Sequence, residues 1–370
     1  MQEDLAARDI EELCEQAAAL RDRGKGKTVS YSLNVFLPLT RLCRNVCSYC
    51  DYRISEPPGE DFFLSPDEVL AAARNGEKAG CTEALLVTGD KPEMRYPEAR
   101  RWLRDHHLDS TAQYACAMAR LVLNETRLHP HTNAGVVNRG ELAELKLVNA
   151  SVGLMLETTA ERLSQSGKAH FQSPDKVPQA RLDFLARAGE MRIPTTTGLL
   201  IGIGETRQER QDTILAIRRV HENYGHIQEV IIQNFKPKSS LHGTHAAAQI
   251  ASVPFSEILW TCAAARLLLG PCLNLQAAPN LVPRAWLTAC LGAGINDWGG
   301  ISPVTPDYVN QDSPWPPLAV LKQETEAAGF HLRRRFPVYP EFIDWLQPLL
   351  KERLMRDVDE DGYVRTASAC

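Results

Sequence analysis

The chain has 370 residues, of which 44% are hydrophobic and 24% are charged, and its net charge is −5 at pH 7. This is the composition of an ordinary globular protein, and the excess of acidic residues argues against nucleic acid as a partner, because a nucleic-acid-binding domain needs a basic face. No apolar run reaches the roughly 20 residues of a membrane-spanning helix, so we expect no membrane association. Residues 1–25 are charged throughout, which predicts an amphipathic surface helix rather than a signal peptide, and hence a cytoplasmic protein.

After this helix the sequence alternates between apolar stretches and amphipathic stretches. The apolar stretches, which we expect to be strands, are 31–39, 82–90, 128–133, 149–158, 194–205, 227–235, 273–280 and 295–300. The stretches with helical periodicity or capping residues, which we expect to be helices, are 65–80, 97–106, 111–125, 138–147, 173–192, 206–225, 252–270 and 282–294. Because no hairpin signal separates the strands, about eight such units predict an α/β protein with a (β/α)8 TIM-type barrel, complete or partly open. An open doubly wound sheet is the alternative.

The pattern divides the chain into three expected parts. Residues 1–30 form an N-terminal helical segment, 31–300 form the barrel, and 301–370 form an extension packed on the barrel. The extension begins with a proline-rich stretch and then becomes helical. In a barrel of this type the chemistry lies at the C-terminal ends of the strands, so we expect the functional residues in the loops that follow the strands.

Three cysteines lie together in the stretch "LCRNVCSYC", directly after the first predicted strand. Cys43, Cys47 and Cys50 are separated by three and then two residues. The remaining cysteines are scattered through apolar or helical stretches, where we expect reduced thiols of a cytoplasmic protein. They are Cys14, Cys81, Cys116, Cys262, Cys272, Cys290 and Cys370.

Three thiols in one loop predict an iron–sulfur cluster with one open position. Cysteine thiolates hold a 4Fe-4S cluster, and three of them leave the fourth iron free to bind a substrate or cosubstrate. A zinc site is a weaker interpretation, because no fourth ligand stands at a recognisable spacing. A redox pair formed by Cys47 and Cys50 would leave Cys43 without a role.

The cysteine loop after a first barrel strand resembles that of the radical S-adenosylmethionine superfamily, and Tyr49 matches an aromatic residue found there. The resemblance implies that the amino and carboxylate groups of S-adenosylmethionine bind the open iron. One electron from the cluster would then cleave the cosubstrate and release a 5′-deoxyadenosyl radical. In this interpretation the protein supplies orientation and keeps water away.

Other motifs imply where S-adenosylmethionine would bind. The turn "TGD", formed by Thr88, Gly89 and Asp90, stands where the superfamily has a Gly-Gly-Glu turn whose backbone holds the methionine amino group; only Gly89 matches. Glu157, after the apolar "VGLML", stands where the superfamily often contacts the ribose hydroxyls.

The stretch "GLLIGIGE" resembles the superfamily's glycine-containing strand, with Gly198 and Gly202 at the matching positions. Gly202 would let the backbone approach the adenine closely.

Several further stretches resemble the CofG-type subunits of FO synthase over roughly residues 32–320. They include "LHPHTNAGV", "VNASVGLMLETT", "YGHIQEVIIQNFKPK" and "GINDWGGISPVTPDYVN". The resemblance implies an enzyme of coenzyme F-420 biosynthesis that forms 7,8-didemethyl-8-hydroxy-5-deazariboflavin with loss of ammonia. It also implies two protein partners, a separate CofH-type radical enzyme and a one-electron reductant. Alternatives are a biotin-synthase-like or menaquinone-pathway radical enzyme and a non-catalytic iron–sulfur protein.

The substrate residues are expected on two other strand ends. We place "GINDWGG" at the end of the eighth strand, so that Asn296 would bind the substrate and Asp297 would act as a proton relay for the departing ammonia. Gln233 and Asn234, at the end of the sixth strand, would contribute amide groups from another side.

Overall fold

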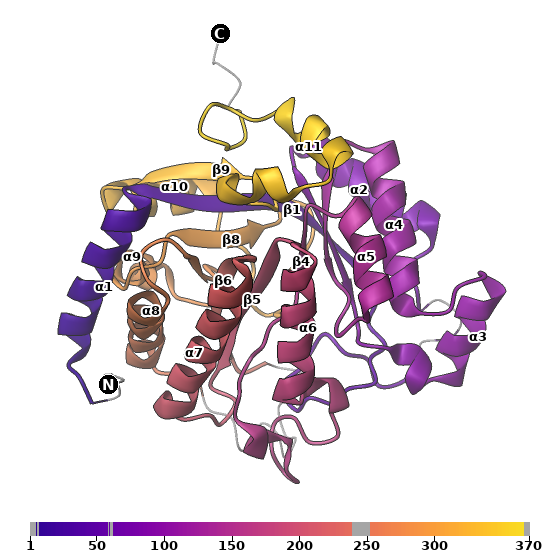
Figure 1. Cartoon of the computed structure of the whole chain (residues 1–370), viewed down its shortest axis with the longest axis horizontal. Helices are drawn as coiled ribbons and strands as arrows, with labels where there is room; N and C mark the ends of the chain where they lie inside the picture. The colour runs from indigo at the N-terminus through magenta and orange to yellow at the C-terminus, as the bar shows by residue number, and fades with distance from the viewer. Residues whose placement is uncertain (1–4, 6, 58, 60–61, 239–251, 366–370) are drawn as a thin grey trace.

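The computed structural model describes residues 5, 7–57, 59, 62–238 and 252–365, and its centre is a closed barrel of eight parallel strands (Figure 1). The strands are β1 Thr28–Thr40, β2 Glu83–Thr88, β3 His129–Asn133, β4 Ser151–Gly153, β5 Thr195–Ile201, β6 Ile227–Asn234, β7 Asn274–Ala277 and β8 Asp297–Ile301. Each strand pairs with the next one along the chain, and β1 pairs with both β8 and β2. The predicted (β/α)8 barrel is therefore confirmed, and the open sheet is excluded.

Helices cover the outside of the barrel. They are α1 Ile10–Lys25, α2 Pro66–Lys78, α3 Pro97–Asp105, α4 Thr111–Glu125, α5 Arg139–Val148, α6 Pro178–Glu190, α7 Arg207–Tyr224, α8 Phe255–Leu269, α9 Leu287–Gly292, α10 Leu318–Ala327 and α11 Pro348–Met355. None of the described helices is long and apolar enough to cross a membrane.

Capping residues explain where several helices begin. Ser65, Asn138 and Thr206 cap α2, α5 and α7, and each accepts a hydrogen bond from the backbone of a glutamate three residues later, whose side chain bonds back to the cap. This reciprocal arrangement satisfies backbone donors that a helix cannot satisfy internally.

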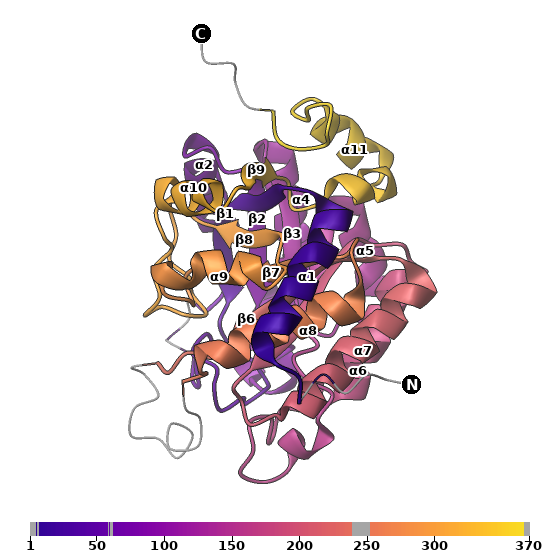
Figure 2. The ribbon, with the colours of Figure 1, turned by 90° about the vertical axis from the view of Figure 1, so that its left-hand side faces the viewer.

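The N-terminal helix α1 lies across α8 and beside α9 (Figure 2). Its Arg21 is almost fully buried and donates hydrogen bonds of 2.9 Å to the carbonyl oxygens of Leu291 and Ile295. A buried guanidinium needs such acceptors, because an unpaired charge in the interior is strongly unfavourable. The helix is thus tied to the segment that leads into β8.

The segment after β8 adds a strand that the sequence did not predict. β9, His331–Arg335, pairs in parallel with the first residues of β1, from Thr28 to Ser32. Together with α10 and α11 it lies at the N-terminal end of the barrel, at the top of Figure 1, opposite the loop between β4 and α6. The stretch "HLRRR" has no apolar alternation, so it lacks the usual signal of a strand.

The position expected for Asn296 and Asp297 is wrong. Asp297 begins β8 instead of ending it, so both residues lie at the N-terminal end of the barrel, away from the cysteines. The side chain of Asn296 accepts a hydrogen bond of 2.8 Å from Arg266, and Asp297 is an ion-pair partner of Arg335. The glycine pair Gly299 and Gly300, which suggests a loop, is in fact inside the strand.

A buried ionic network closes the N-terminal end of the barrel, which we call the floor. Arg335, at the end of β9, donates to both oxygens of Asp297 at 2.8 and 3.0 Å and to Glu229 at 2.9 Å. Tyr339 donates to the same oxygen of Glu229 at 2.8 Å, and Ser30 donates to Asp297. Burial raises the pKa of Glu229 to about 7. One arginine thus holds two buried carboxylates.

Removing this arginine should destabilise the whole fold. We expect Arg335→Met to lower the free energy of unfolding by about 3–5 kcal/mol, because it leaves two buried carboxylates without their cation. Denaturant unfolding of the purified protein measures this. Arg333→Met is the matched control, since Arg333 pairs with Asp359 and Asp361 near the surface, and it should cost under about 1 kcal/mol. Equal losses in the two variants would contradict the account of the floor.

Candidate functional site

A cavity of about 310 Å³ lies at the C-terminal ends of the strands. Most of the residues predicted for the site line it: Cys43, Cys47, Tyr49, Cys50, Thr88, Gly89, Asp90, Glu157, Gln233 and Asn234. They come from the loops after β1, β2 and β4 and from the end of β6, which are far apart in the sequence. The closed parallel barrel brings them together because all its strands end at the same rim.

The cysteine loop is held by the connection between β4 and α6. The backbone N–H of Ser48 donates to the carbonyl of Ala169 at 3.0 Å, and that of Val46 donates to the hydroxyl of Ser173 at 2.9 Å. The thiol of Cys47 lies 3.5 Å from the same hydroxyl. These contacts hold the backbone of the cysteine loop and the thiol of Cys47 in place.

An ion-pair cluster fixes the same two loops. Arg44, inside the cysteine loop, makes a two-pronged contact with the carboxylate of Asp175, and Lys91 pairs with that carboxylate at 3.0 Å. Asp175 is buried. Burial alone would raise its pKa, but the contacts with Arg44 and Lys91 outweigh burial and lower it. The carboxylate therefore joins the loops after β1, β2 and β4.

The thiols suit a cluster better than a single ion. Burial raises the pKa of Cys43 to about 12 and also raises that of Cys47, so their thiolates need a positively charged partner. The backbone N–H of Asp90 points at the sulfur of Cys43, 3.2 Å away, and such donors stabilise a cluster ligand.

No three His, Cys, Asp or Glu side chains of the described residues are close enough together to hold one metal ion. Thiolates around one zinc ion lie roughly 3.8 Å apart, given Zn–S bonds of about 2.3 Å. A four-iron cluster spreads its ligands over a larger volume, because each thiolate binds a different iron.

The "TGD" turn presents unsatisfied polar atoms. Oγ1 of Thr88 and Oδ1 of Asp90 are buried and have no hydrogen-bond partner among the described residues. The other oxygen of Asp90 accepts from the backbone N–H of Val136 at 3.3 Å. Burial raises the pKa of Asp90 to about 6, and the nearby charge of Asp175 adds to the shift. A carboxylate left in this state can hold a ligand amino group, which would supply both the proton donor and the charge.

Glu157 is the centre of a second polar network. Its backbone has φ +66°, in the left-handed region that few residues other than glycine adopt. Its carboxylate accepts from the hydroxyl of Tyr49 and from Lys176, and His170 lies 3.2 Å away. Burial alone would raise the pKa of Glu157, but Lys176 and Arg181 outweigh it and hold that pKa well below its usual range.

Glu157 is therefore anionic, with several of its hydrogen-bonding positions occupied. It lies beyond the short strand β4, which ends at Gly153, so the predicted ten-residue strand 149–158 is too long. The bent backbone still aims the residue at the cavity.

Gly198 and Gly202 do not line the cavity. A Cβ at Gly198 would overlap the backbone of Ile231 on the neighbouring strand, so this glycine allows β5 and β6 to approach each other. Gly202 has φ +94° and faces Val253. The interpretation of Gly202 as a contact of the adenine has no support in this geometry, and Leu200 is the residue of that stretch that lines the cavity.

Four cationic residues of the cavity were not predicted from the sequence: Arg53, which follows the cysteines, and three others. Lys176, Arg181 and Lys238 line it and are buried or half-buried. Each is held by a polar contact: Lys176 by Glu157, Arg181 by the carbonyls of Asp175 and Met155, and Lys238 by the carbonyl of Val309 at 2.6 Å. Single basic residues carry no local signal of a binding role, so only the fold reveals them.

Comparison with known proteins agrees with this geometry. The model of the Radical SAM superfamily matches residues 37–217. A 7,8-didemethyl-8-hydroxy-5-deazariboflavin synthase of Methanopyrus kandleri is 46% identical over 339 residues, which are 91% of this chain and the whole of that protein. The chain belongs to the family of radical SAM proteins that includes this synthase. Family membership implies a 4Fe-4S cluster and S-adenosylmethionine.

Longer relatives share the same region. An FO synthase of Nocardia farcinica is 48% identical over 355 residues, 92% of this chain and 40% of that protein, and one of Mycobacterium tuberculosis is 44% identical over 43% of its length. The chain thus spans less than half the length of these relatives.

Two solved structures share the fold. The hydrogenase maturase HydG of Carboxydothermus hydrogenoformans aligns with a TM-score of 0.70 at 19% identity, covering 94% of this chain and 82% of that one. Methylornithine synthase aligns with a TM-score of 0.65 at 19% identity, covering 89% and 92%. At this identity the likeness establishes the fold alone.

Gly89 is the residue on which the shape of the site depends most closely. A Cβ at this position would overlap the carbonyl of Leu42 and the side chain of Cys43, so Gly89→Ala should push the end of β2 away from the cysteine loop. We expect the variant to lose most of its iron after anaerobic reconstitution, measured as iron per chain. Gly292→Ala is the control, because a Cβ there meets nothing within 4 Å. Full iron content in Gly89→Ala would show that the close approach is unimportant.

Proposed function

We propose that this protein catalyses the deazaflavin-forming half of FO synthesis, in the biosynthesis of coenzyme F-420. The observation that carries the proposal is the cavity at the barrel rim, which combines three cysteine thiols with a carboxylate that has one unsatisfied oxygen. A relative of matching extent that is named 7,8-didemethyl-8-hydroxy-5-deazariboflavin synthase supports the assignment of the product. The proposed substrate is 5-amino-5-(4-hydroxybenzyl)-6-(D-ribitylimino)-5,6-dihydrouracil.

The proposed reaction is an oxidative ring closure with loss of ammonia, and this makes the protein a lyase. The substrate loses one hydrogen atom, one proton, one electron and ammonia, while a carbon–nitrogen bond closes the central ring. The hydrogen atom goes to the adenosyl fragment of S-adenosylmethionine, and the electron replaces the one used to cleave the cosubstrate. Bound together, the cluster and S-adenosylmethionine supply the radical that starts this chemistry.

The protein residues would divide the work as follows. Cys43, Cys47 and Cys50 would hold the cluster, and Asp90 would hold the amino group of the cosubstrate. Glu157, kept anionic by Lys176, would accept hydrogen bonds from the ribose.

At the rim, Gln233 and Asn234 would contact the substrate. Gln233 lines both the cavity and the space below it. Asn234 donates to the carbonyl of Leu281 at 3.1 Å, and its amide oxygen would accept a hydrogen bond from the substrate.

Two partners complete the proposal. A separate CofH-type radical enzyme would provide the substrate by joining a tyrosine-derived hydroxybenzyl group to a ribitylamino-uracil. A protein reductant would deliver single electrons to the cluster. Both follow from the resemblance to FO synthase subunits.

The three cysteines should be individually essential. We expect anaerobically reconstituted protein to bind about four irons per chain, and Cys43→Ala, Cys47→Ala and Cys50→Ala to lose both iron and cleavage of S-adenosylmethionine. Mass spectrometry of 5′-deoxyadenosine and of the deazaflavin measures both activities. Cys272→Ala, an exposed thiol, should behave like the unmodified protein. Cleavage that persists in any of the three variants would refute the cluster assignment.

Asp90 gives a separate test of the cosubstrate site. Asp90→Asn keeps the shape and the backbone N–H that points at Cys43, so iron content should not change. Affinity for S-adenosylmethionine should fall about tenfold or more, because a hydrogen bond to a charged group contributes about 1.5–3 kcal/mol. Equilibrium dialysis with the reconstituted protein measures this affinity, and Asp67→Asn on the exposed start of α2 serves as the control. An unchanged affinity would remove Asp90 from the site.

A further inference from the structure

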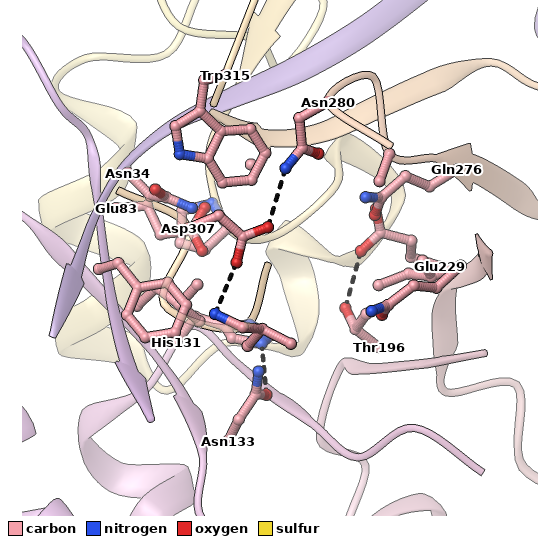
Figure 3. Close-up of a pocket in the computed structure, with 18 of the residues that line it drawn as sticks. Asn34, Glu83, His131, Asn133, Thr196, Glu229, Gln276, Asn280, Asp307 and Trp315 are labelled. Atoms are coloured by element: carbon pink, nitrogen blue, oxygen red, sulfur yellow. Dashed lines mark hydrogen bonds between the residues drawn. The ribbon is translucent and has the colours of Figure 1, made fainter. Parts of the chain in front are cut away.

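A second cavity, of about 180 Å³, lies inside the barrel, between the first cavity and the N-terminal ends of the strands. Figure 3 shows the side chains that line it. Its walls carry an unusual number of carboxamide side chains, and we name it the amide chamber after them: Asn34, Asn133, Gln233, Gln276, Asn280 and Asn310. The interior of an eight-stranded barrel is normally filled by branched apolar side chains. The polar walls therefore need an explanation.

Glycines keep the chamber open. A Cβ at Gly299 would overlap the amide of Gln276, and a Cβ at Gly300 would overlap that of Asn34. A Cβ at Gly153 would overlap the amide of Asn133. The glycine pair in "GINDWGG" thus serves the interior, because it leaves room for amides from the neighbouring strands.

Several polar groups in the chamber have no partner among the described residues. Oδ1 of Asn34, Oδ1 of Asn280 and Nε1 of Trp315 are buried and unsatisfied. Buried polar atoms in folded proteins are almost always hydrogen-bonded to protein, water or ligand, so a group of them lining one cavity marks a site for polar guests.

The orientation of Asn280 is set by its neighbours. Its NH₂ group donates to Asp307 at 2.9 Å and to the carbonyl of Ser313 at 3.0 Å. Asn310 donates to the same oxygen of Asp307 at 3.0 Å, and Figure 3 shows the bond between Asn280 and Asp307. The amide oxygen of Asn280 is thus left as an acceptor, while the indole N–H of Trp315 is a free donor. A hydroxyl group can satisfy both kinds of atom.

The chamber adjoins the cavity that holds the cysteines. The two share five wall residues, which are Asn133, Ile231, Gln233, Val309 and Asn310. The volume of the chamber, about 180 Å³, is smaller than the 310 Å³ of the cavity that holds the cysteines. We therefore assign the narrower ribityl chain to the chamber and the rings to the larger cavity.

The charges of the chamber favour a neutral ligand. The carboxylates of Glu83, Glu229 and Asp307 line it, whereas Arg335 is engaged by Asp297 and Glu229. A phosphorylated chain would meet an excess of negative charge, which disfavours its binding.

We propose that the amide chamber binds the unphosphorylated ribityl chain of the substrate, with Asn280 and Trp315 as specificity-determining residues. This inference rests on the proposed function. In this binding mode the ribityl hydroxyls point toward the N-terminal end of the barrel, and the reacting rings stay at the C-terminal rim, beside the cysteines.

Fluorescence titration of the reconstituted protein tests the chamber with three ligands. They are 7,8-didemethyl-8-hydroxy-5-deazariboflavin, an analogue with an n-pentyl chain in place of ribityl, and the 5′-phosphate ester. The unmodified protein should bind the ribityl compound at least tenfold more tightly than either of the others. Equal affinity for the pentyl analogue or the phosphate ester would overturn the proposal.

Variants locate the effect in the chamber. Trp315→Phe removes one N–H and keeps an aromatic ring, so it should weaken binding of the ribityl compound about tenfold and leave the pentyl analogue unchanged. Asn280→Ala should act in the same direction. Trp286→Phe, at a half-exposed tryptophan on the surface, is the matched control. Equal losses for both ligands, or no loss for either, would contradict the role of these residues.

Product formation keeps the two proposals apart. If the unmodified protein forms no deazaflavin from the substrate, the proposed function fails. If it forms deazaflavin but does not distinguish the ribityl compound from the pentyl analogue, only the chamber proposal fails.

Discussion

The interior of this barrel is polar, and most other features of the structure follow from that constraint. Amides, carboxylates and a buried histidine replace the apolar side chains that usually fill an eight-stranded barrel. Such groups cannot pack against one another without partners, because an unsatisfied polar atom in the interior is costly. The floor is therefore closed by charge, with Arg335 held between Asp297 and Glu229. The remaining interior, toward the C-terminal ends of the strands, stays open and presents polar atoms to a ligand.

The same constraint gives the C-terminal extension a structural role. β9 carries Arg335 and pairs with the start of β1, so the extension supplies both a strand and the cation of the floor. The rim is organised differently, by loops tied to each other through Asp175 and Glu157. The ionic network of Arg335 lies at one end of the two adjoining cavities, and the loops joined through Asp175 and Glu157 lie at the other. This arrangement would keep a substrate in a single orientation toward the radical.

The parts predicted from sequence were those with strong local signals. Apolar strands, capped helices and the alternation of the two predicted the barrel, and the strand-then-loop context placed the three cysteines on the rim. The contacts of Glu157 with Tyr49 and of Arg44 with Asp175 join loops distant in sequence. No local pattern encodes them.

The errors have physical causes as well. Asp297 was placed at the mouth because "DWGG" resembles a turn, whereas its glycines belong to a strand that needs space for neighbouring amides. β9 was missed because its charged residues form ion pairs instead of an apolar face. The amide chamber could not be predicted, since its asparagines and glutamines are single residues on different strands and loops.

The most direct test of the account is an anaerobic crystal structure of the reconstituted protein with S-adenosylmethionine and 7,8-didemethyl-8-hydroxy-5-deazariboflavin. The account predicts a cluster held by Cys43, Cys47 and Cys50, with the amino group of S-adenosylmethionine near Asp90. It also predicts the ribityl chain inside the barrel, within hydrogen-bonding distance of Asn280 and Trp315. A ribityl chain that points out of the rim, with the chamber filled by water or by rearranged side chains, would contradict it.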